Sequence, residues 1–332
     1  MTTRSIENLP WVEKYRPSAM SDIYGQKEIV VTLEKFVDEG KLPHLLFYGP
    51  PGTGKTSTVL AMAKRIYGPQ HYKSMILELN ASDDRGIDVV REQVKNFAST
   101  MQIFNKGFKL IILDEADSMT NVAQNALRRI IEKYTKNARF VILANYAHKL
   151  NPALLSRCTR FRFQPLQESA IQERIKYVCE KETLKVSEPA TDALLKLSKG
   201  DMRKSLNVLQ ACQSALDDPS NDEVTKEMVY ECIGNANPDD INSLLDSILK
   251  EDFTTSYLYF EKVTKSKGLA IIDILSGIIE ILDSYKLKPQ TRVKILKRLS
   301  EIEYGISKGG NTKIQSSAVI ATIKDAMVGE AY

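Results

Sequence analysis

The sequence contains few of the side chains that build most metal sites and disulfides. Its 332 residues include three histidines and four cysteines. The cysteines are spread singly along the chain, with no C-x-x-C pair, at Cys158, Cys179, Cys212 and Cys232. Zinc-type sites and disulfide frameworks need such residues in close, repeated spacings. We therefore expect neither a metal site of histidine and cysteine nor a disulfide framework.

Long apolar runs are also missing. No stretch approaches the roughly 18 to 20 apolar residues that a membrane span needs. Residues 1–10 are polar and lack the apolar centre of a secretory signal. The composition, with 43% hydrophobic and 27% charged residues, is that of a globular protein. We expect no membrane contact and an intracellular protein, with the cytoplasm and the nucleus both open.

The chain lacks a strong charge of either sign. Its formal net charge of +4 is compatible with nucleic-acid binding but does not demonstrate it. Any contact with DNA must therefore come from a local basic patch. A chain of 332 residues is too long for one ordinary core, and we expect two or three domains.

The segment after the apolar run Leu45-Leu46-Phe47-Tyr48 fits the pattern G-x-x-x-x-G-K-[ST] at every position. It reads Gly49-Pro50-Pro51-Gly52-Thr53-Gly54-Lys55-Thr56. A strand that enters such a loop and leaves as a helix, here over residues 56–66, directs several backbone N–H groups and a helix dipole at one point. Lys55 can then reach the β- and γ-phosphates of a nucleotide, and the Thr56 hydroxyl can ligate magnesium between them.

The alternative interpretation of this segment is a glycine-rich turn with a chance Lys-Thr pair. Eight matching residues between a strand and a helix rarely coincide. Gly52 and Gly54 also supply turns that a Cβ would block. We therefore predict a phosphate site, with Lys55 as an exposed loop residue that contributes little to the core.

A second motif follows the apolar segment at residues 108–113, where the chain reads Asp114-Glu115-Ala116-Asp117. A strand with apolar residues on both faces is typical of a parallel sheet covered by helices, and such sheets bind ligands at their carboxyl ends. Asp114 is placed to hold magnesium, directly or through water. Glu115 can orient or deprotonate an attacking water. The alternative is a charged helix cap after a core strand. The phosphate loop in the same chain favours the magnesium and water roles over that alternative.

The rest of the first half reads as alternating helices and strands. Helices are expected at residues 27–39, 87–100 and 121–134, and strands at 75–80, 139–144 and 159–164, with a polar turn at 81–86. Asn145 closes one strand. Its amide can bond a γ-phosphate or the attacking water, but asparagine also commonly ends strands in turns.

From residue 167 onward the pattern predicts helices alone. They are expected at residues 167–183, 188–199 and 201–215, with Gly200 ending one helix and Asp201 capping the next. Residues 234–238 are typical of a domain boundary, and roughly five helices follow to residue 327. One of these carries an apolar stripe, which is either a bundle core or an oligomer interface: Ile271, Ile274, Leu275, Ile278, Ile279 and Leu282.

An aromatic and basic arm precedes the phosphate loop. It reads Leu9-Pro10-Trp11-Val12-Glu13-Lys14-Tyr15-Arg16-Pro17. We expect the bracketing prolines to keep the arm extended rather than helical. The arm could fold over a nucleotide base, or it could pack on the domain for stability only.

Taken together, these motifs resemble those of the AAA+ ATPases of the clamp-loader branch. Further segments are similar to the small subunits of eukaryotic replication factor C, and they include Trp11 to Pro17, Leu79 to Gly86 and Gln124 to Arg129. Gly107-Phe108-Lys109 and Ile306-Ser307-Lys308-Gly309-Gly310-Asn311 are most similar to the fungal third-subunit group of that family. The resemblance covers essentially the whole chain, and the archaeal small subunit is the nearest competitor.

The resemblance implies an α/β fold in three parts. Residues 1–165 would form an AAA+ P-loop ATPase domain with a parallel sheet. Residues 166–234 would form a small helical lid, and residues 235–332 an all-α collar that holds a five-membered ring open as a spiral.

The resemblance also implies roles for single residues. Val12, Arg16 and Tyr24 would line the adenine pocket, and the phosphate loop would extend to Ser57. Asn145 would be the first sensor and Arg203 the second. Arg157 would be an arginine finger that acts in trans, on the ATP of the neighbouring subunit. Catalysis would then rest on Asp114, Glu115, Asn145, Arg157 and Arg203, with magnesium on Thr56 and Asp114.

The implied function is an ATPase subunit of a nuclear heteropentamer with four other clamp-loader subunits. With ATP and Mg²⁺ it would open the sliding clamp PCNA and load it onto primer–template DNA, touched through its phosphates. Arg85 and Arg91 are candidate DNA contacts, although each could equally be a solvated charge on a helix. Two alternatives are an AAA+ remodelling ATPase and a structural subunit that binds nucleotide without turnover.

Overall fold

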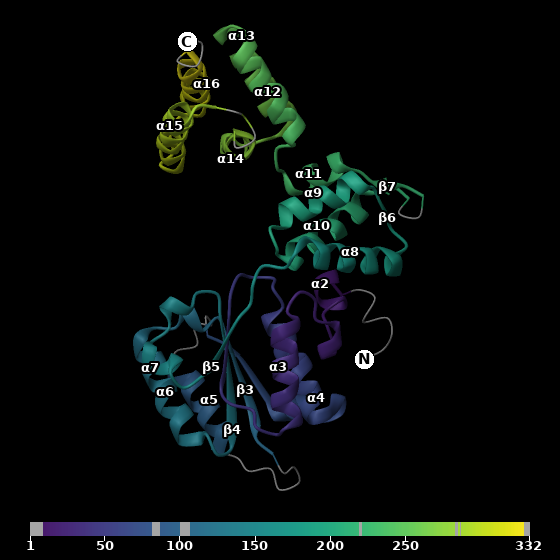
Figure 1. Ribbon diagram of the computed structural model, residues 1–332, viewed down its shortest axis with the longest axis vertical. Helices are drawn as coiled ribbons and strands as arrows, with labels where there is room; N and C mark the ends of the chain where they lie inside the picture. Colours follow the sequence, from purple (N-terminus) through teal and green to yellow (C-terminus); the bar gives the residue numbers. More distant parts are fainter. Residues whose placement is uncertain are drawn as a thin grey trace. The chain divides into compact units, whose positions relative to one another are not determined.

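The computed structural model describes residues 9–81, 87–99, 107–218, 221–282, 285 and 287–328 (Figure 1). The chain divides into two compact units, each treated separately below. The first comprises Met1–Lys185 with Leu194–Asp222, and the second comprises Val186–Ala193 with Glu223–Tyr332.

A five-stranded parallel sheet forms the centre of the first unit. Its order is β2-β3-β4-β1-β5, from β1 (Leu45–Tyr48), β2 (Ile76–Asn80), β3 (Lys109–Asp114), β4 (Ala138–Ala144) and β5 (Thr159–Arg162). Because all five strands run in one direction, their carboxyl ends share one edge. The phosphate loop, the acidic motif and Asn145 follow three of these ends, so the topology gathers them there.

Helices cover both faces of this sheet. Figure 1 shows α3 (Lys27–Asp38) and α4 (Lys55–Met75) on one side, and α5 (Ile87–Ser99), α6 (Asn121–Tyr134) and α7 (Pro152–Leu155) on the other. Phe47, Val59 and Leu110 belong to the core on the first side, and Ile111, Leu127 and Phe140 to the core on the second. The central strands β1, β3 and β4 are thus buried on both faces, as predicted for the segment at residues 108–113, whereas β2 and β5 at the sides of the sheet are more exposed.

Further helices of the first unit are α8 (Glu168–Glu182) and α10 (Met202–Ala215). Asp201 caps α10 as expected, because its carboxylate accepts hydrogen bonds from the backbone N–H groups of Arg203 and Lys204. Gly200 has a φ of +86°, and a Cβ there would lie 2.6 Å from the Pro165 side chain. The glycine therefore sets how the chain enters α10.

Three local features differ from the predictions. The arm contains a one-turn helix, α2 (Trp11–Lys14), because the Pro10 carbonyl accepts from Glu13 and Lys14. Proline fixes its own φ and restricts the residue before it, so the residues from Trp11 to Tyr15 are free to coil. The helix after the phosphate loop breaks at the non-helical Gly68, with φ +77°, close to its predicted end at residue 66, but a second helical stretch from Pro69 to Met75 was not predicted. Finally, β6 (Lys185–Val186) and β7 (Glu223–Val224) form a two-stranded sheet where we expected helices alone.

The helix α9 (Glu188–Ser198) lies at the boundary between the two units in the sequence, and the described part of the second unit after β7 is helical. It contains α11 (Lys226–Ile233), α12 (Pro238–Lys250), α13 (Phe253–Lys267), α14 (Ile271–Leu282), α15 (Pro289–Ser307) and α16 (Thr312–Val328). Five helices therefore follow residue 238 in the described part of the chain, as predicted. The apolar stripe of α14 packs into a bundle core with Ile241, Leu299 and Val319. Among the described helices, none has the length and apolar content to cross a bilayer.

Candidate nucleotide site

The phosphate loop joins the end of β1 to the start of α4. Gly49, Gly52 and Gly54 all have positive φ angles, of +145°, +68° and +93°. A Cβ on Gly49 would lie 2.1 Å from the Phe163 carbonyl oxygen, and one on Gly52 would lie 1.6 Å from a carboxylate oxygen of Asp201. The loop therefore needs glycine both for its backbone angles and for the close approach of β5 and α10.

Lys55 lies inside this loop. Its Nζ donates to the carbonyls of Gly49 and Pro50 at 2.7 and 2.8 Å, and to Asn145 Oδ1 at 3.0 Å. The residue is 8% exposed, so the expectation of an exposed lysine was wrong. Loop carbonyls that would otherwise be buried without donors draw the ammonium inward. Burial lowers the pKa of Lys55 to about 8, and the nearby Asp114 carboxylate opposes that shift.

Thr56 and Asp114, the two predicted magnesium ligands, are in contact. The Thr56 hydroxyl donates to Asp114 Oδ2 at 3.0 Å. Neighbouring oxygens around an octahedral Mg²⁺ lie about 2.9 Å apart when each is 2.0 to 2.1 Å from the ion. A hydroxyl and a carboxylate are also the oxygen ligands that this cation prefers. The spacing and the chemistry of the pair therefore both fit magnesium.

Glu115 follows Asp114 in an unusual backbone conformation. Its φ of 53° and ψ of 37° are left-handed, and its side chain is exposed. A non-glycine residue in this region is uncommon and often marks a functional turn. Its N–H donates to Asp114 Oδ1 at 2.8 Å, which leaves Oδ2 for Thr56. The turn therefore fixes the Asp114 carboxylate while Glu115 stays accessible to water.

Asp117 is a site residue that the sequence reasoning did not single out. Its two carboxylate oxygens accept from the backbone N–H groups of Asn145 and Tyr146, each at 3.2 Å. The acidic motif thereby holds the end of β4 and places the Asn145 amide beside Lys55. Its position in Asp114-Glu115-Ala116-Asp117 was visible in the sequence, but its partner was not.

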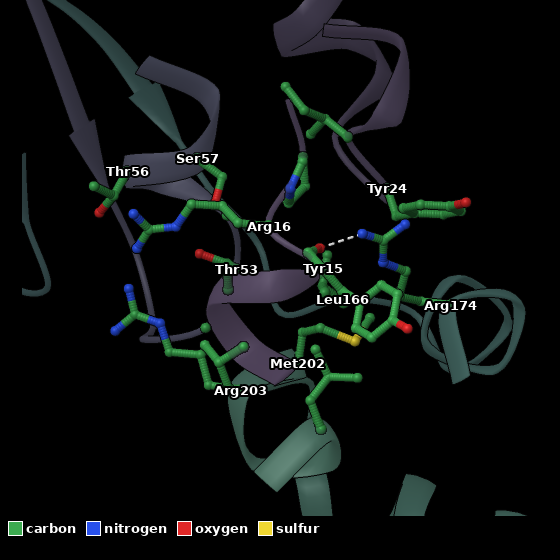
Figure 2. Close-up of a pocket in the computed structure, with 16 residues that line it drawn as sticks. Tyr15, Arg16, Tyr24, Thr53, Thr56, Ser57, Leu166, Arg174, Met202 and Arg203 are labelled. Atoms are coloured by element: carbon green, nitrogen blue, oxygen red, sulfur yellow. Dashed lines mark hydrogen bonds between the residues drawn. The ribbon is translucent and has the colours of Figure 1, made fainter. Parts of the chain in front are cut away.

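A pocket with about 680 Å³ of empty space, open solvent included, lies beside the loop. It is lined by the three expected adenine-site residues, Val12, Arg16 and Tyr24, and also by Thr53, Ser57 and Arg203. Figure 2 shows the guanidinium groups of Arg16 and Arg203 directed toward the side of the pocket where Thr56 lies. Two cations and the helix N-terminus therefore face the same space, an arrangement suited to a polyphosphate.

The arm packs on α8 and α10, and several of its residues also line this pocket. The backbone N–H of Trp11 donates to Gln210 Oε1 on α10 at 3.0 Å. Arg174 on α8, which is 8% exposed, donates to the Tyr15 carbonyl, and its guanidinium lies 5.4 Å from the Tyr24 ring centre (Figure 2). A buried arginine of this kind is not recognisable in the sequence, because its partners are distant along the chain.

Comparisons with known proteins match both halves of the chain. Residues 45–166 match the family described as "ATPase family associated with various cellular activities (AAA)", and residues 236–322 match "Replication factor C C-terminal domain". Over 328 residues the chain is 62% identical to Replication factor C subunit 3 of Saccharomyces cerevisiae, and this alignment covers 98% of this chain and 96% of that protein. The chain belongs to the replication factor C subunits. It is therefore a clamp-loader ATPase subunit, and the resemblance to the fungal third-subunit group is confirmed.

More distant relatives agree. Replication factor C subunit 5 of Homo sapiens is 50% identical over 329 residues, with 98% of this chain and 95% of that protein covered. Among solved structures, the Thermotoga maritima RuvB Holliday junction branch migration motor aligns with a TM-score of 0.53 at 17% identity. That alignment covers 77% of this chain and 86% of the other, and it supports the AAA+ fold alone.

Arg157, the arginine finger implied by the replication factor C resemblance, lies away from this pocket. Thr159, two residues later, pairs with Leu45 at the first residue of β1. The phosphate loop follows the last residue of that four-residue strand, and the ends of such a strand lie about 10 Å apart. The guanidinium forms an ion pair with Glu132 on α6. Arg157 thus lies near the amino-terminal ends of the parallel strands, whereas the phosphate loop lies at their carboxyl ends.

The candidate DNA contacts lie outside this description. Arg85 and the side chain of Arg91 belong to the residues that the structure does not describe.

Proposed function

We propose that this chain binds ATP between its N-terminal arm, its phosphate loop and the start of α10, and hydrolyses it with help from a neighbouring subunit. The observation that carries the proposal is that two residues of the phosphate loop each form a hydrogen bond with a residue from another motif. Lys55 bonds to Asn145, and Thr56 bonds to Asp114. These four residues are the groups that a γ-phosphate and its metal ion require together.

Val12, Arg16 and Tyr24 would take the adenosine end of the nucleotide, because they line the pocket next to the loop. The phosphates would lie on the N–H groups and side chains of Gly49, Pro50, Pro51, Gly52, Thr53, Gly54, Lys55, Thr56 and Ser57. Pro50 and Pro51 have no N–H to offer a phosphate, and the Pro50 carbonyl instead accepts from Lys55 Nζ.

Thr56 and Asp114 would hold Mg²⁺, which supplies positive charge between the β- and γ-phosphates. Glu115 would orient the attacking water or accept its proton. Asn145 and Arg203 would bond the γ-phosphate, the first from the strand edge and the second from α10. Hydrolysis would remove these contacts and so loosen the lid from the loop.

We infer that the subunit works in a five-membered ring with four other replication factor C subunits. Residues 1–165 would be the ATPase domain, residues 166–234 the lid and residues 235–332 the collar that joins the ring. Arg157, at the sheet edge opposite its own phosphate loop, would reach the ATP of a neighbour. Because each ATP then lies between two subunits, the nucleotide state would set the geometry of the ring.

In the ATP state this ring would grip the sliding clamp PCNA and primer–template DNA in the nucleus, and hydrolysis would release both. DNA would be followed through its phosphates, without base readout. Arg85 and Arg91 remain our candidates for those contacts. The match of residues 236–322 to the replication factor C C-terminal domain favours this function over a remodelling ATPase.

The test is Glu115→Gln in the assembled complex. Replacing the carboxylate by an amide of the same shape should leave ATP affinity unchanged. It should slow hydrolysis at this site about 100-fold or more, the usual contribution of a positioned base. Single-turnover hydrolysis and nucleotide titration measure the two effects separately.

Glu39→Gln, which alters an exposed carboxylate after α3, is the matched control and should change neither the affinity nor the rate. Unchanged single-site turnover in Glu115→Gln would indicate a nucleotide-binding structural subunit instead.

A further inference from the structure

Arg157 is held within its own subunit rather than free at the surface. Its Nη2 forms an ion pair with Glu132 of α6. Its Nη1 donates to the Ala153 carbonyl and lies 3.4 Å from Ser156 Oγ. The side chains of Arg157 and Glu132 are 32% and 44% exposed, so the pair is reachable from solvent. Two of the three guanidinium nitrogens are therefore engaged in this conformation.

A second arginine faces the same carboxylate. Arg128 lies one turn before Glu132 on α6, and its Nε is 4.0 Å from Glu132 Oε1. That Nε is buried, and it has no hydrogen-bond partner in the described part of the chain. A buried donor without an acceptor is unfavourable and rare in folded proteins. One carboxylate thus serves two guanidinium groups and bonds closely to only one of them.

We propose that Glu132 is a positioning residue that stores Arg157 in the resting subunit and releases it by exchanging to Arg128. When Arg157 turns to the phosphate of a neighbouring subunit, Glu132 closes the 4.0 Å gap and satisfies the Arg128 Nε. The inference rests on the proposed action of Arg157 in trans.

The charges explain why an exchange is needed. A carboxylate that stays on the finger would face the negative γ-phosphate and weaken its attraction for Arg157. Moving to Arg128 keeps Glu132 paired, and Arg128 and Glu132 have the i, i+4 spacing at which helix side chains meet. The resting pair also keeps Arg157 near one rotamer, ready to turn outward.

The test compares ATP hydrolysis by assembled complexes in the absence of DNA. Glu132→Gln keeps the side-chain shape and removes the charge, so it should weaken the resting hold on Arg157. We expect hydrolysis to rise about two- to fivefold, which corresponds to the loss of a partly exposed ion pair. The rise should vanish in Glu132→Gln combined with Arg157→Ala. General damage to the fold would lower the rate instead.

Arg128→Met removes the alternative partner. It should lower hydrolysis in the wild-type background and have no further effect beside Glu132→Gln. Equal effects in both backgrounds, or none in either, would overturn the exchange. Glu34→Gln, which breaks the Arg65–Glu34 pair of similar exposure, is the matched control and should leave the rate unchanged.

The result for Arg157→Ala alone distinguishes a wrong role for Arg157 from a wrong role for Glu132. If that variant hydrolyses ATP like the wild type, the action of Arg157 in trans is wrong and the exchange falls with it. If it is impaired while Glu132→Gln is unchanged or slower, only the role of Glu132 is wrong.

Discussion

At the scale of single residues, Lys55 links nucleotide binding to pH. Without nucleotide its ammonium is buried among loop carbonyls, and burial lowers its pKa from 10.5 to about 8. A triphosphate beside it would favour the charged form and raise that pKa again. ATP binding should therefore take up a proton where Lys55 is mostly neutral, above about pH 8, and far less at pH 7.

Calorimetry in two buffers with different heats of ionisation measures this uptake. At pH 8.5 we expect most of one proton per ATP, and an affinity that falls as the pH rises further. Lys55→Arg is the control, because a guanidinium stays charged throughout this range. Proton uptake that persists in Lys55→Arg would assign the effect to another group.

Four of the residues that the sequence predicted share one property. Lys55, Thr56, Asp114 and Asn145 each lie at or after the carboxyl end of a strand, and parallel strands bring those ends together. Asp117, Arg174 and Glu132 were missed because their roles come from partners far away in the sequence. The burial of Lys55 was missed for a related reason, since its acceptors are backbone carbonyls that no side-chain pattern reveals.

At the scale of elements, His44 joins the start of β1 to β4 and to the end of α6. Its Nδ1 accepts from the Phe140 N–H at 3.2 Å, and its Nε2 lies 3.3 Å from Thr135 Oγ1. The Thr135 hydroxyl itself donates to the Ile131 carbonyl, so it must accept from Nε2. The ring is thereby neutral, with its proton on Nε2. Burial, and then the charge of Arg139, lower the pKa of His44 to about 4.

This pKa predicts a loss of stability in acid. The folded state binds fewer protons at His44 than the unfolded state between pH 6.5 and about 4. The contribution of His44 is therefore fully present above pH 6.5 and is lost as the pH falls toward 4. We expect the difference in unfolding free energy between the wild type and His44→Gln to shrink over this range.

Denaturant titrations of the single chain at pH 7, 5.5 and 4.5 measure that difference. The exposed His71 offers a control, since His71→Gln should follow the wild type at each pH. A constant gap between His44→Gln and the wild type would mean that His44 titrates alike in both states.

Elements defined by periodicity were predictable, and those defined by one backbone angle or a few contacts were not. The helices and strands around the sheet follow from runs of apolar residues. By contrast, the break at Gly68, the single turn of α2 and the two-residue strands β6 and β7 leave no periodic pattern. Helices and strands this short depend on capping and tertiary contacts rather than on propensity.

At the scale of the whole molecule, the sequence predicted an α/β half followed by a helical half. The order of strands was not predictable, because β1 lies between β4 and β5 although neither adjoins it in the sequence. That order places the phosphate loop beside Asn145 at the carboxyl ends of the strands, while the start of β5 lies at their amino-terminal ends. The separation of the nucleotide site from Arg157 is therefore a property of topology rather than of any motif.

The assembled ring provides the test of this division, through Arg157→Ala. The single chain should bind ATP normally, because Arg157 pairs with Glu132 and lies at the edge opposite its own phosphate loop. In the complex, hydrolysis at the neighbouring site should fall. Fingers supplied in trans contribute about 10³ to 10⁵ in rate in well-studied phosphoryl transfer, and a ring with several active sites would show a smaller overall loss.

Combining Arg157→Ala with an inactive phosphate loop identifies the site on which it acts. When the neighbour's loop lysine is replaced, that site is already silent, so the loss of Arg157 should change little. When Lys55 of this chain is replaced instead, the neighbour's site still turns over, and the loss of Arg157 should remain visible. The reverse pattern would mean that Arg157 serves its own nucleotide. A reach across the sheet of that kind would contradict the pairing of Thr159 with Leu45 that separates the two edges.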